Sequence, residues 1–413
     1  MQILMLSSTF PYPPSRGGTQ VRTFNLLQYL SRRHDVILGT VRSPDVTDAQ
    51  IDALRQQVTE LAVFQTPKTV STGKIQKIRR FGQFLWSGTP PNLLSSYSTA
   101  MQNWADDLVA AGKCDAVTCE HSVNEIYVRP EWRQKLLTVV NIHSSVWGTC
   151  REMLASGTSQ KPLRDRLNLP LLARYETRYC AKFSRIVATT STDKQQLLEL
   201  LSPPRLSLKA DVFLPRIDVI PNGVDLTEFP CRSIDPGGHS LIFAGAMNNL
   251  PNIDAAQFLS WQILPALQQR YPDATLTLVG ASPVPEVLAL GKLQGIQVVG
   301  RVQRMAEYLH QAAVCVVPMR IGFGIKNKTL EAMAAGIPVV ASDRGLEGLA
   351  VDGGAQPKRA LRANKVQEYV EAITSLFENQ QLRQELSEGA RSLVESQYTW
   401  DIIGRQYDRL LQF

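Results

Sequence analysis

The feature that most restricts the fold is an alternation of short apolar segments with helical ones. The chain opens with an apolar strand pattern at 3–6, a Pro- and Gly-rich loop at 10–18, and a helical pattern in which apolar residues recur every three or four positions. Further short apolar runs lie at 34–40, 116–119, 137–142 and 185–189. Such runs, separated by helices, are typical of a parallel sheet covered by helices on both faces.

The alternation stops near the middle of the chain and then begins again. Residues 219–225 break the pattern, and 230–238 are rich in Pro, Gly and Ser, as linkers between domains are. A second series of strands is predicted at 240–244, 274–279, 296–299, 314–317 and 338–341, with helices such as 253–271 and 329–335 between them and two or three helices over 366–413. The sequence therefore predicts an α/β protein with two tandem Rossmann-like doubly wound domains, at 1–225 and 226–395.

Composition excludes several classes of protein. Of the 413 residues, 44% are hydrophobic and 20% are charged, which is ordinary for a globular protein. No apolar run approaches the roughly 18 residues that a membrane-spanning helix needs, and the N-terminus lacks the basic segment of a secretory signal. The six cysteines form no Cys-x-x-Cys pair, so we expect inert thiols and no metal site. These features predict a cytoplasmic protein.

The positive charge is concentrated in the N-terminal half. Residues 1–225 carry 27 Lys and Arg against 19 Asp and Glu, a net charge of +8, whereas the remainder carries 17 against 18. A basic half suits either plain solvation or peripheral association with the anionic inner face of a membrane. The stripe of Ile75, Ile78, Phe84, Leu85 and Trp86 fits membrane contact or core packing. No nucleic-acid-binding motif is present, so nucleic acid is not an expected partner.

The most informative loop follows the strand pattern at 314–317. Its sequence, Gly322-Phe-Gly-Ile-Lys-Asn-Lys-Thr-Leu-Glu331, runs into a helical pattern. The glycines expose backbone amides at the start of the helix, and Lys326 and Lys328 add two cations beside them. Glu331 lies one turn further on, where a carboxylate can accept hydrogen bonds from both hydroxyls of a ribose. The helix dipole alone explains Glu331 but not the lysines and glycines together, so the segment predicts a diphosphate site that needs no metal.

Two further loops carry weaker signals. Gly17 and Gly18 lie between the first strand and the first helix, where paired glycines let the backbone approach a phosphate. His143 closes the strand pattern at 137–142, and a histidine at that edge can donate a hydrogen bond to a sugar hydroxyl. When each signal is taken alone, a tight turn explains the glycines better than a phosphate site does, and a structural role explains His143 equally well.

Taken together, these residues resemble the retaining GT-B glycosyltransferases of family 4, also called group 1 glycosyltransferases. The resemblance runs almost from end to end. Its motifs are Pro13-Pro-Ser-Arg-Gly-Gly18, Asn141-Ile-His143, Val187-Ala-Thr-Thr-Ser191, Val219-Ile-Pro-Asn-Gly-Val-Asp225, Phe243-Ala-Gly-Ala-Met247, the segment from Lys328 to Ser342, and Tyr398-Thr-Trp400. The stretches 247–254 and 325–328 look most like a bacterial subgroup associated with exopolysaccharide assembly.

The resemblance implies two Rossmann-like domains that face a cleft, with a C-terminal helix, 396–413, that packs back on the first domain. It implies catalytic positions at Gly17 and Gly18, near the donor phosphate or the transferred sugar, and at His143, which would contact that sugar. It implies binding of the donor's ribose by Glu331, a place near its base for Val302, and contact with its diphosphate and sugar around Gly324. The full set of implied donor-binding residues is Gly245, Asn252, Val302, Gly322, Phe323, Gly324, Ile325, Lys326, Asn327, Lys328 and Glu331.

The chain departs from the family pattern at two places. The commoner pattern has a Glu at the position of Phe323, and that Glu usually holds hydroxyls of the transferred sugar. Many relatives also place a basic pair after the first strand of the second domain, whereas residues 246–252 contain no cation here. Our hypothesis is that Lys326 and Lys328 replace the missing charges.

We therefore predict a hexosyltransferase-type enzyme (EC 2.4) that uses a nucleotide diphosphate sugar, without a metal or other cofactor, and retains the anomeric configuration. Its acceptor would be a glycan, a lipid-linked molecule or a small molecule. Three alternatives stay open: a nucleotide-sugar epimerase of the same fold, a nicotinamide-dependent dehydrogenase, and a non-catalytic GT-B scaffold. This chain lacks the Gly-x-Gly-x-x-Gly fingerprint of nicotinamide-dependent dehydrogenases, which argues against that alternative. Phe323 in place of Glu favours the non-catalytic scaffold.

Overall fold

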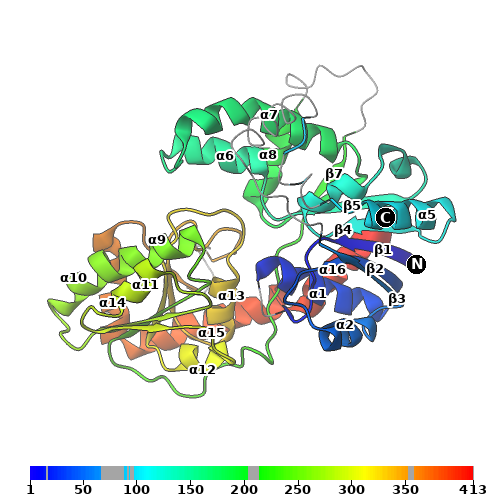
Figure 1. Cartoon of the computed structure of the whole chain (residues 1–413). Helices are drawn as coiled ribbons and strands as arrows, with labels where there is room; N and C mark the ends of the chain where they lie inside the picture. The colour runs from blue at the N-terminus through cyan, green and yellow to red at the C-terminus, as the bar shows by residue number, and fades with distance from the viewer. Residues whose placement is uncertain are drawn as a thin grey trace. The chain divides into compact units, whose positions relative to one another are not determined.

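The computed structural model describes residues 1–14, 17–66, 88–90, 93, 97–202, 214–351 and 358–412. The chain forms two compact units (Figure 1): the first comprises Met1–Pro221 and Ile403–Phe413, and the second Asn222–Ile402. The predicted stripe from Ile75 to Trp86, together with Ser15 and Arg16 of the first glycine loop, lies outside the described residues.

The first unit is built on a seven-stranded parallel sheet with the strand order β3-β2-β1-β4-β5-β6-β7. Its central strands are apolar because both of their faces are buried. The strands are β1 (Gln2–Ser7), β2 (Asp35–Arg42), β3 (Glu60–Gln65), β4 (Ala116–Cys119), β5 (Leu137–Ile142), β6 (Arg185–Ala188) and β7 (Arg216–Val219).

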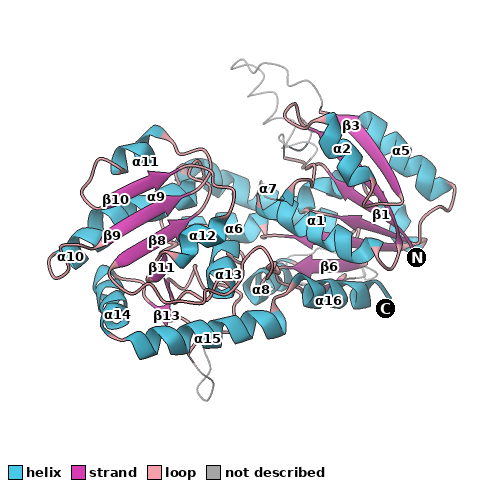
Figure 2. Ribbon diagram, turned by 90° about the horizontal axis from the view of Figure 1, so that it is seen from below, coloured by secondary structure: helices cyan, strands magenta, loops and turns pink. Residues whose placement is uncertain are grey.

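Helices flank both faces of this sheet (Figure 2). The apolar core is formed by side chains of the strands that pack against side chains of the helices. The helices are α1 (Gly18–Ser31), α2 (Asp48–Arg55), α5 (Thr99–Ala110), α6 (Val146–Ala155), α7 (Pro162–Cys180) and α8 (Ser191–Leu200), with short 3-10 helices at Ser122–Tyr127 and Pro130–Gln134. The last helix, α16 (Trp400–Gln412), begins in the second unit, and its residues from Ile403 onward belong to the first.

The second unit contains a six-stranded parallel sheet with the order β10-β9-β8-β11-β12-β13. Its strands are β8 (Ser240–Ala244), β9 (Thr275–Val279), β10 (Ile296–Val299), β11 (Val314–Val317), β12 (Val339–Ala341) and β13 (Leu361–Arg362). Its helices are α9 (Leu250–Phe258), α10 (Leu264–Gln268), α11 (Pro285–Leu290), α12 (Met305–His310), α13 (Asn327–Ala334), α14 (Val366–Glu378) and α15 (Gln380–Gln397). The α/β class and the two doubly wound sheets predicted from the sequence are confirmed.

The long helix predicted at 253–271 is present as one helical run over 250–268, but its hydrogen-bond pattern changes midway. It consists of α9, a π-helical turn at Leu259–Ile263, and α10. Pro265 lies in the first turn of α10 and has no backbone N–H to donate, so the regular hydrogen-bond ladder cannot pass through it. Among the described residues, no helix is both long enough and apolar enough to span a bilayer.

Candidate active site

Each sheet reverses its strand order at one point, and the site residues predicted from the sequence gather near these points. In the first sheet the reversal lies between β1 and β4, and in the second it lies between β8 and β11. Loops that leave neighbouring strands there run in opposite directions and open a crevice at the carboxyl edge, where α/β sheets bind ligands. Gly17 follows β1, Gly245 follows β8, and the loop from Gly322 to Lys326 follows β11.

The loop between β11 and α13 is shaped by two glycines. Gly322 and Gly324 have φ angles of 92° and 77°, a backbone conformation that other residues rarely adopt. The loop ends at Lys326, the residue that precedes α13, and no side chain caps the start of that helix. The first amides of α13 therefore point out of the helix without a side-chain acceptor, as an anion site requires.

Lys328 lies against the end of β8, although 84 residues separate it in sequence from Ala244. Its Nζ donates a hydrogen bond of 2.5 Å to Asn252 Oδ1 and lies 4.4 Å from the centre of the Phe243 ring. A Cβ atom at Gly245 would come within 2.7 Å of the same Nζ, so a side chain at this position would force the ammonium group to shift. Burial, followed by the neighbouring Lys326, lowers the pKa of Lys328 to about 7.

Lys326 and Glu331 complete the charged cluster at α13. Lys326 Nζ donates to the backbone carbonyl of Gly324 and lies 3.7 Å from a carboxylate oxygen of Glu347. Burial, followed by repulsion from Glu228, raises the pKa of Glu331 to about 7. A cation of lowered pKa and a carboxyl of raised pKa on one helix are typical of a site that binds a polar ligand.

The remaining predicted donor residues occupy different surroundings. Asn327 Oδ1 accepts a hydrogen bond of 2.8 Å from Asn222 Nδ2. Phe323 lies under the guanidinium group of Arg344, 4.4 Å from the ring centre, so this position carries a cation–π contact where relatives have a carboxylate. Ile325 is buried in the core of the second unit. Val302 follows β10, two strands from β8, and packs against the same core.

His143 lies directly after β5 in the first unit. His143 is partly buried, and its buried Nε2 has no hydrogen-bond partner among the described residues. Burial, followed by the neighbouring His121, lowers the pKa of His143 well below its usual value, so the imidazole is neutral. A neutral imidazole with an unused nitrogen can donate to or accept from a sugar hydroxyl.

His121 is a candidate site residue that our interpretation of the sequence missed. Its ring centre lies 4.8 Å from that of His143, and its Nδ1 accepts a hydrogen bond of 3.3 Å from the backbone of Val123. Its φ angle is 115°, a strained backbone conformation that is concentrated at functional sites. The signal was available, because His121 follows the strand pattern at 116–119 as His143 follows that at 137–142.

A buried polar network lies next to the two histidines. Asn141 Nδ2 donates to Glu120 Oε1 at 3.2 Å and to the Tyr407 hydroxyl at 2.8 Å. The guanidinium group of Arg22 in α1 donates to Asn141 Oδ1 at 3.4 Å and to the carbonyls of Ile220 and Pro221. These bonds join α1, β5 and the last helix beneath the carboxyl edge.

The described residues at the end of the first glycine loop are Gly17 and Gly18. Gly17 and Gly18 are exposed, and Gly17 precedes α1 without a side-chain cap. The backbone amides at the start of α1 are therefore accessible to an anion. Gly17, Gly18, His143 and His121 belong to the first unit, and the cluster around Lys328 belongs to the second.

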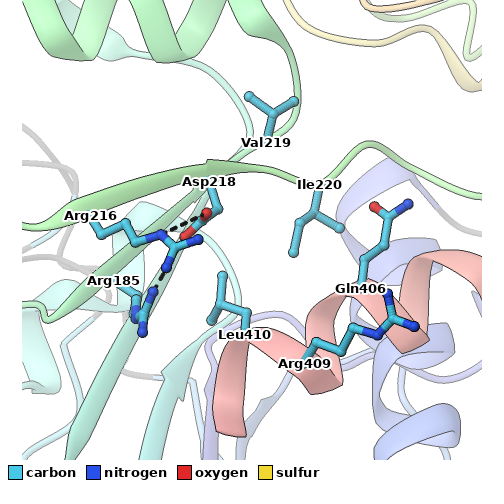
Figure 3. Close-up of a pocket in the computed structure, with 8 residues that line it drawn as sticks. All are labelled: Arg185, Arg216, Asp218, Val219, Ile220, Gln406, Arg409 and Leu410. Atoms are coloured by element: carbon cyan, nitrogen blue, oxygen red, sulfur yellow. Dashed lines mark hydrogen bonds and ion pairs between the residues drawn. The ribbon is translucent and has the colours of Figure 1, made fainter. Parts of the chain in front are cut away.

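Metal-ligand clusters and pockets are the other features of the structure that could indicate a site. Among the described residues, no three His, Cys, Asp or Glu side chains are grouped as metal ligands. A pocket of about 360 Å³ lies along β6, β7 and α16, where Arg185 and Arg216 pair with Asp218 and Arg409 projects from α16 (Figure 3). This pocket contains none of the predicted site residues.

Comparison with protein families identifies both halves of the chain. The profile described as "Glycosyltransferase Family 4" matches residues 16–228, and that described as "Glycosyl transferases group 1" matches residues 238–379. Glycogen synthase of Mycobacterium tuberculosis is 22% identical over 424 residues, covering 98% of this chain and 92% of that protein. Phosphatidyl-myo-inositol mannosyltransferase of Mycolicibacterium smegmatis is 29% identical over 202 residues, covering 47% of this chain and 51% of that protein.

Solved structures share the fold. Sucrose-phosphate synthase from Thermosynechococcus elongatus superposes with a TM-score of 0.67 at 17% identity, covering 100% of this chain and 98% of that one. HepE of Anabaena, solved in complex with UDP and glucose, superposes with a TM-score of 0.64 at 14% identity, covering 100% and 99% of the two chains.

Proposed function

The chain belongs to glycosyltransferase family 4, and from this premise we propose that it moves a sugar from a nucleotide diphosphate sugar to an acceptor with retention of the anomeric configuration. The acceptor would be a glycan, a lipid-linked molecule or a small molecule, and the enzyme would act in the cytoplasm. The names of similar proteins support the proposed classes of donor and acceptor. HepE was solved with UDP-glucose, glycogen synthase acts on a glycan, and the mannosyltransferase acts on a phosphatidylinositol.

The observation that carries the proposal is the convergence of Lys328, Gly245 and Asn252 at the carboxyl edge of β8 and β11. A diphosphate at this edge would meet the amides at the start of α13 and the Lys328 ammonium group. Glu331, one turn further along α13, would accept hydrogen bonds from the ribose hydroxyls. We propose that these groups hold the diphosphate without a metal, because a diphosphate favours the protonated form of Lys328, which then supplies the cation in place of a metal.

The reaction requires stabilisation of a diphosphate leaving group. The bond between the sugar C1 and the phosphate oxygen breaks, and its electron pair stays on that oxygen. The acceptor oxygen bonds to C1 from the same face and gives its proton to the leaving phosphate oxygen, so no dedicated base is needed. Each preorganised donor to the developing charge is typically worth about 3–4 kcal/mol.

His143 would act at the transferred sugar. Because its imidazole is neutral and its Nε2 is unused, it can hydrogen-bond a sugar hydroxyl without adding a positive charge beside the developing sugar cation. Gly17 and Gly18 would place the amides of α1 near the donor. His121, in contact with the His143 ring, would hold it in place.

A ligand screen followed by a matched pair of variants tests the proposal. Thermal shifts with UDP, GDP and ADP sugars identify the base, since a ligand at 100 times its dissociation constant adds about 2.7 kcal/mol. Lys328→Ala should reduce the thermal shift and the turnover strongly, whereas Lys292→Ala, at an exposed lysine of the same unit, should change neither. Unchanged affinity and turnover in Lys328→Ala would refute the site.

The same screen distinguishes the alternatives. A scaffold would bind a donor without turnover, and an epimerase would release free nucleotide without an added acceptor. Binding of NAD(H) would indicate a dehydrogenase. The anomeric configuration of the product, read by NMR, tests retention.

A further inference from the structure

Helix α7 exposes a row of basic and apolar side chains and no acidic ones. Between 161 and 178, a stretch that is described without a gap, the exposed residues are Lys161, Pro162, Leu163, Arg164, Arg166, Leu167, Pro170, Arg174 and Arg178. We call this set the α7 face. It combines five cations with two leucines, whereas an ordinary solvated helix face mixes both signs of charge.

The two acidic side chains of this helix are turned into the fold. Asp165 accepts a hydrogen bond of 2.7 Å from Ser159 Oγ, and its side chain is only 15% exposed. Glu176 is fully buried and accepts hydrogen bonds from Ser145 Oγ at 2.7 Å and from the backbone of Trp147 at 2.9 Å. The exposed charge along α7 is therefore positive. Asp165 forms an ion pair with Arg164, which offsets the charge of that one arginine.

The leucines of the α7 face are unusual for a packed helix. Leu163 and Leu167 are 76% and 67% exposed, one turn apart, and are the most exposed large apolar residues described in the first unit. The opposite end of α7 behaves normally, because Tyr175 and Tyr179 are buried in the core. The helix thus packs through its C-terminal half and leaves apolar surface uncovered at its N-terminal half, beside α6 (Figure 1).

We propose that the α7 face docks the enzyme on an anionic phospholipid bilayer. Leu163 and Leu167 would enter the boundary between headgroups and acyl chains, and Arg166 and Arg174 would pair with lipid phosphates. Charge complementarity alone would also suit a soluble polyanion. The leucines favour the bilayer, because a soluble polyanion would leave them in water.

The docking does not depend on glycosyl transfer, but it would hold the residues proposed for that reaction near the bilayer. Glu176 joins α7 to the start of α6, which follows His143 after two residues. A bilayer held at the α7 face would therefore lie on the same unit as His143, so a lipid-linked acceptor in that bilayer would be held by the unit that carries this histidine. This last consequence rests on the proposed function, whereas the docking itself does not.

Vesicle flotation of the full chain, without donor or acceptor, tests the docking. We expect binding to vesicles of phosphatidylglycerol and phosphatidylcholine and no binding to phosphatidylcholine alone. A charge near an anionic surface changes the partition coefficient about fivefold, so Arg166→Glu with Arg174→Glu should lower it at least about 25-fold. Leu163→Ser with Leu167→Ser should lower it by roughly tenfold or more, because the apolar insertion is lost.

Matched controls separate the α7 face from general charge and hydrophobicity. Lys113→Glu with Lys135→Glu reverses two exposed cations elsewhere in the first unit, and Leu288→Ser with Leu293→Ser removes two exposed leucines of the second. Both controls should bind vesicles as the parent chain does. All four variants should keep the parent's thermal unfolding midpoint, because the altered side chains are exposed. Leu167→Trp adds a direct readout, since brominated lipids should quench its fluorescence.

Three results would overturn the proposal. The first is equal binding to anionic and zwitterionic vesicles, and the second is vesicle binding that both α7 variants leave unchanged. The third is binding to heparin that is tighter than binding to anionic vesicles and insensitive to the leucine variant, which would assign the face to a soluble polyanion. Because no sugar donor is present, each result leaves the proposed glycosyl transfer to be judged by its own assay.

Discussion

Donor binding should change the protonation of Lys328 and Glu331 in opposite directions. Without ligand, the pKa of each group is about 7, Lys328 because its charge is buried beside Lys326 and Glu331 because its charge is buried beside Glu228. A diphosphate favours the charged form of Lys328, and ribose hydroxyls favour the charged form of Glu331. Lys328 must therefore take up a proton and Glu331 must release one, each in a different pH range.

The magnitude follows from the two pKa values. At pH 8 roughly nine-tenths of Lys328 is neutral, and one phosphate charge at about 4 Å in a medium of effective dielectric constant about 20 contributes about 4 kcal/mol, or about three pKa units. A shift of this size leaves Lys328 fully charged in the complex at pH 8, so Lys328 takes up about 0.9 proton, Glu331 releases about 0.1, and the net uptake is about 0.8 proton. At pH 6 Lys328 takes up only about 0.1 proton. A downward pKa shift of similar size at Glu331, which is roughly nine-tenths neutral at that pH, releases about 0.9 proton, and the net release is about 0.8 proton. The sign reverses near pH 7.

Calorimetry in buffers of different ionisation enthalpy measures this proton count directly. The ligand should be the nucleotide sugar identified by the thermal-shift screen, because its diphosphate, esterified at both ends, has no proton that titrates near pH 7. Lys328→Met should lose the uptake at pH 8 and keep the release at pH 6, and Glu331→Gln should do the reverse. Lys292→Met, at an exposed lysine, should match the parent chain at both values.

Two outcomes would refute the reasoning. If the parent chain takes up no proton at pH 8, then Lys328 is either charged before binding or remote from the diphosphate. If Lys328→Met retains the uptake, then another group titrates. A count that keeps one sign across pH 6 to 8 would remove Glu331 from the ribose site while leaving Lys328 in place.

Three further outcomes follow from individual contacts. Because burial lowers the pKa of Lys328 from 10.5 to about 7, its cost to the fold grows as the pH falls through that interval, so Lys328→Met should raise the thermal unfolding midpoint more at pH 7 than at pH 10. Gly245→Ala places a Cβ within 2.7 Å of Lys328 Nζ and should weaken donor binding by on the order of tenfold or more in a titration, without abolishing folding. His121→Gly should be more stable to urea than His121→Ala by roughly 1–2 kcal/mol, because only glycine relieves the strain of a φ of 115°, and equal stabilities would contradict that strain.

The central strands could be predicted from the sequence because they are buried on both faces and are therefore continuously apolar. β4 and β6 are buried over their whole length and are apolar apart from Thr118 and Arg185. The strands that the sequence did not predict lie at sheet edges and are only partly buried: β3 and β7 at the two edges of the first sheet, and β13 at one edge of the second. The sequences of β3 and β7, Glu60 to Gln65 and Arg216 to Val219, mix charged and apolar residues because one side of each strand has no neighbouring strand.

The candidate site could be predicted only as far as strand ends are visible in a sequence. Gly17, His143 and the loop from Gly322 onward were found because each follows an apolar run. The partners that set their chemistry were not visible, because they depend on which strands are neighbours. Asn252 is 76 residues from Lys328 in sequence, and their contact exists because β8 lies beside β11. The lowered pKa of Lys328 likewise depends on burial, which the residue type alone does not reveal.

The structure separates two lysines that look equivalent in the sequence. Lys326 turns back toward Gly324 and Glu347, whereas Lys328 reaches Asn252, in the segment where relatives carry a basic pair and this chain has none. If donor affinity depends on where the positive charge lies, and not on which residue supplies it, then exchanging the residues at positions 328 and 252 should preserve donor affinity. Lys328→Asn alone should lose donor affinity, and adding Asn252→Lys should restore most of it, because the ammonium group returns to the same contact from the other side. No recovery in the double variant, with folding intact, would mean that Lys328 acts through the geometry of α13 and not as a replacement for the missing cations.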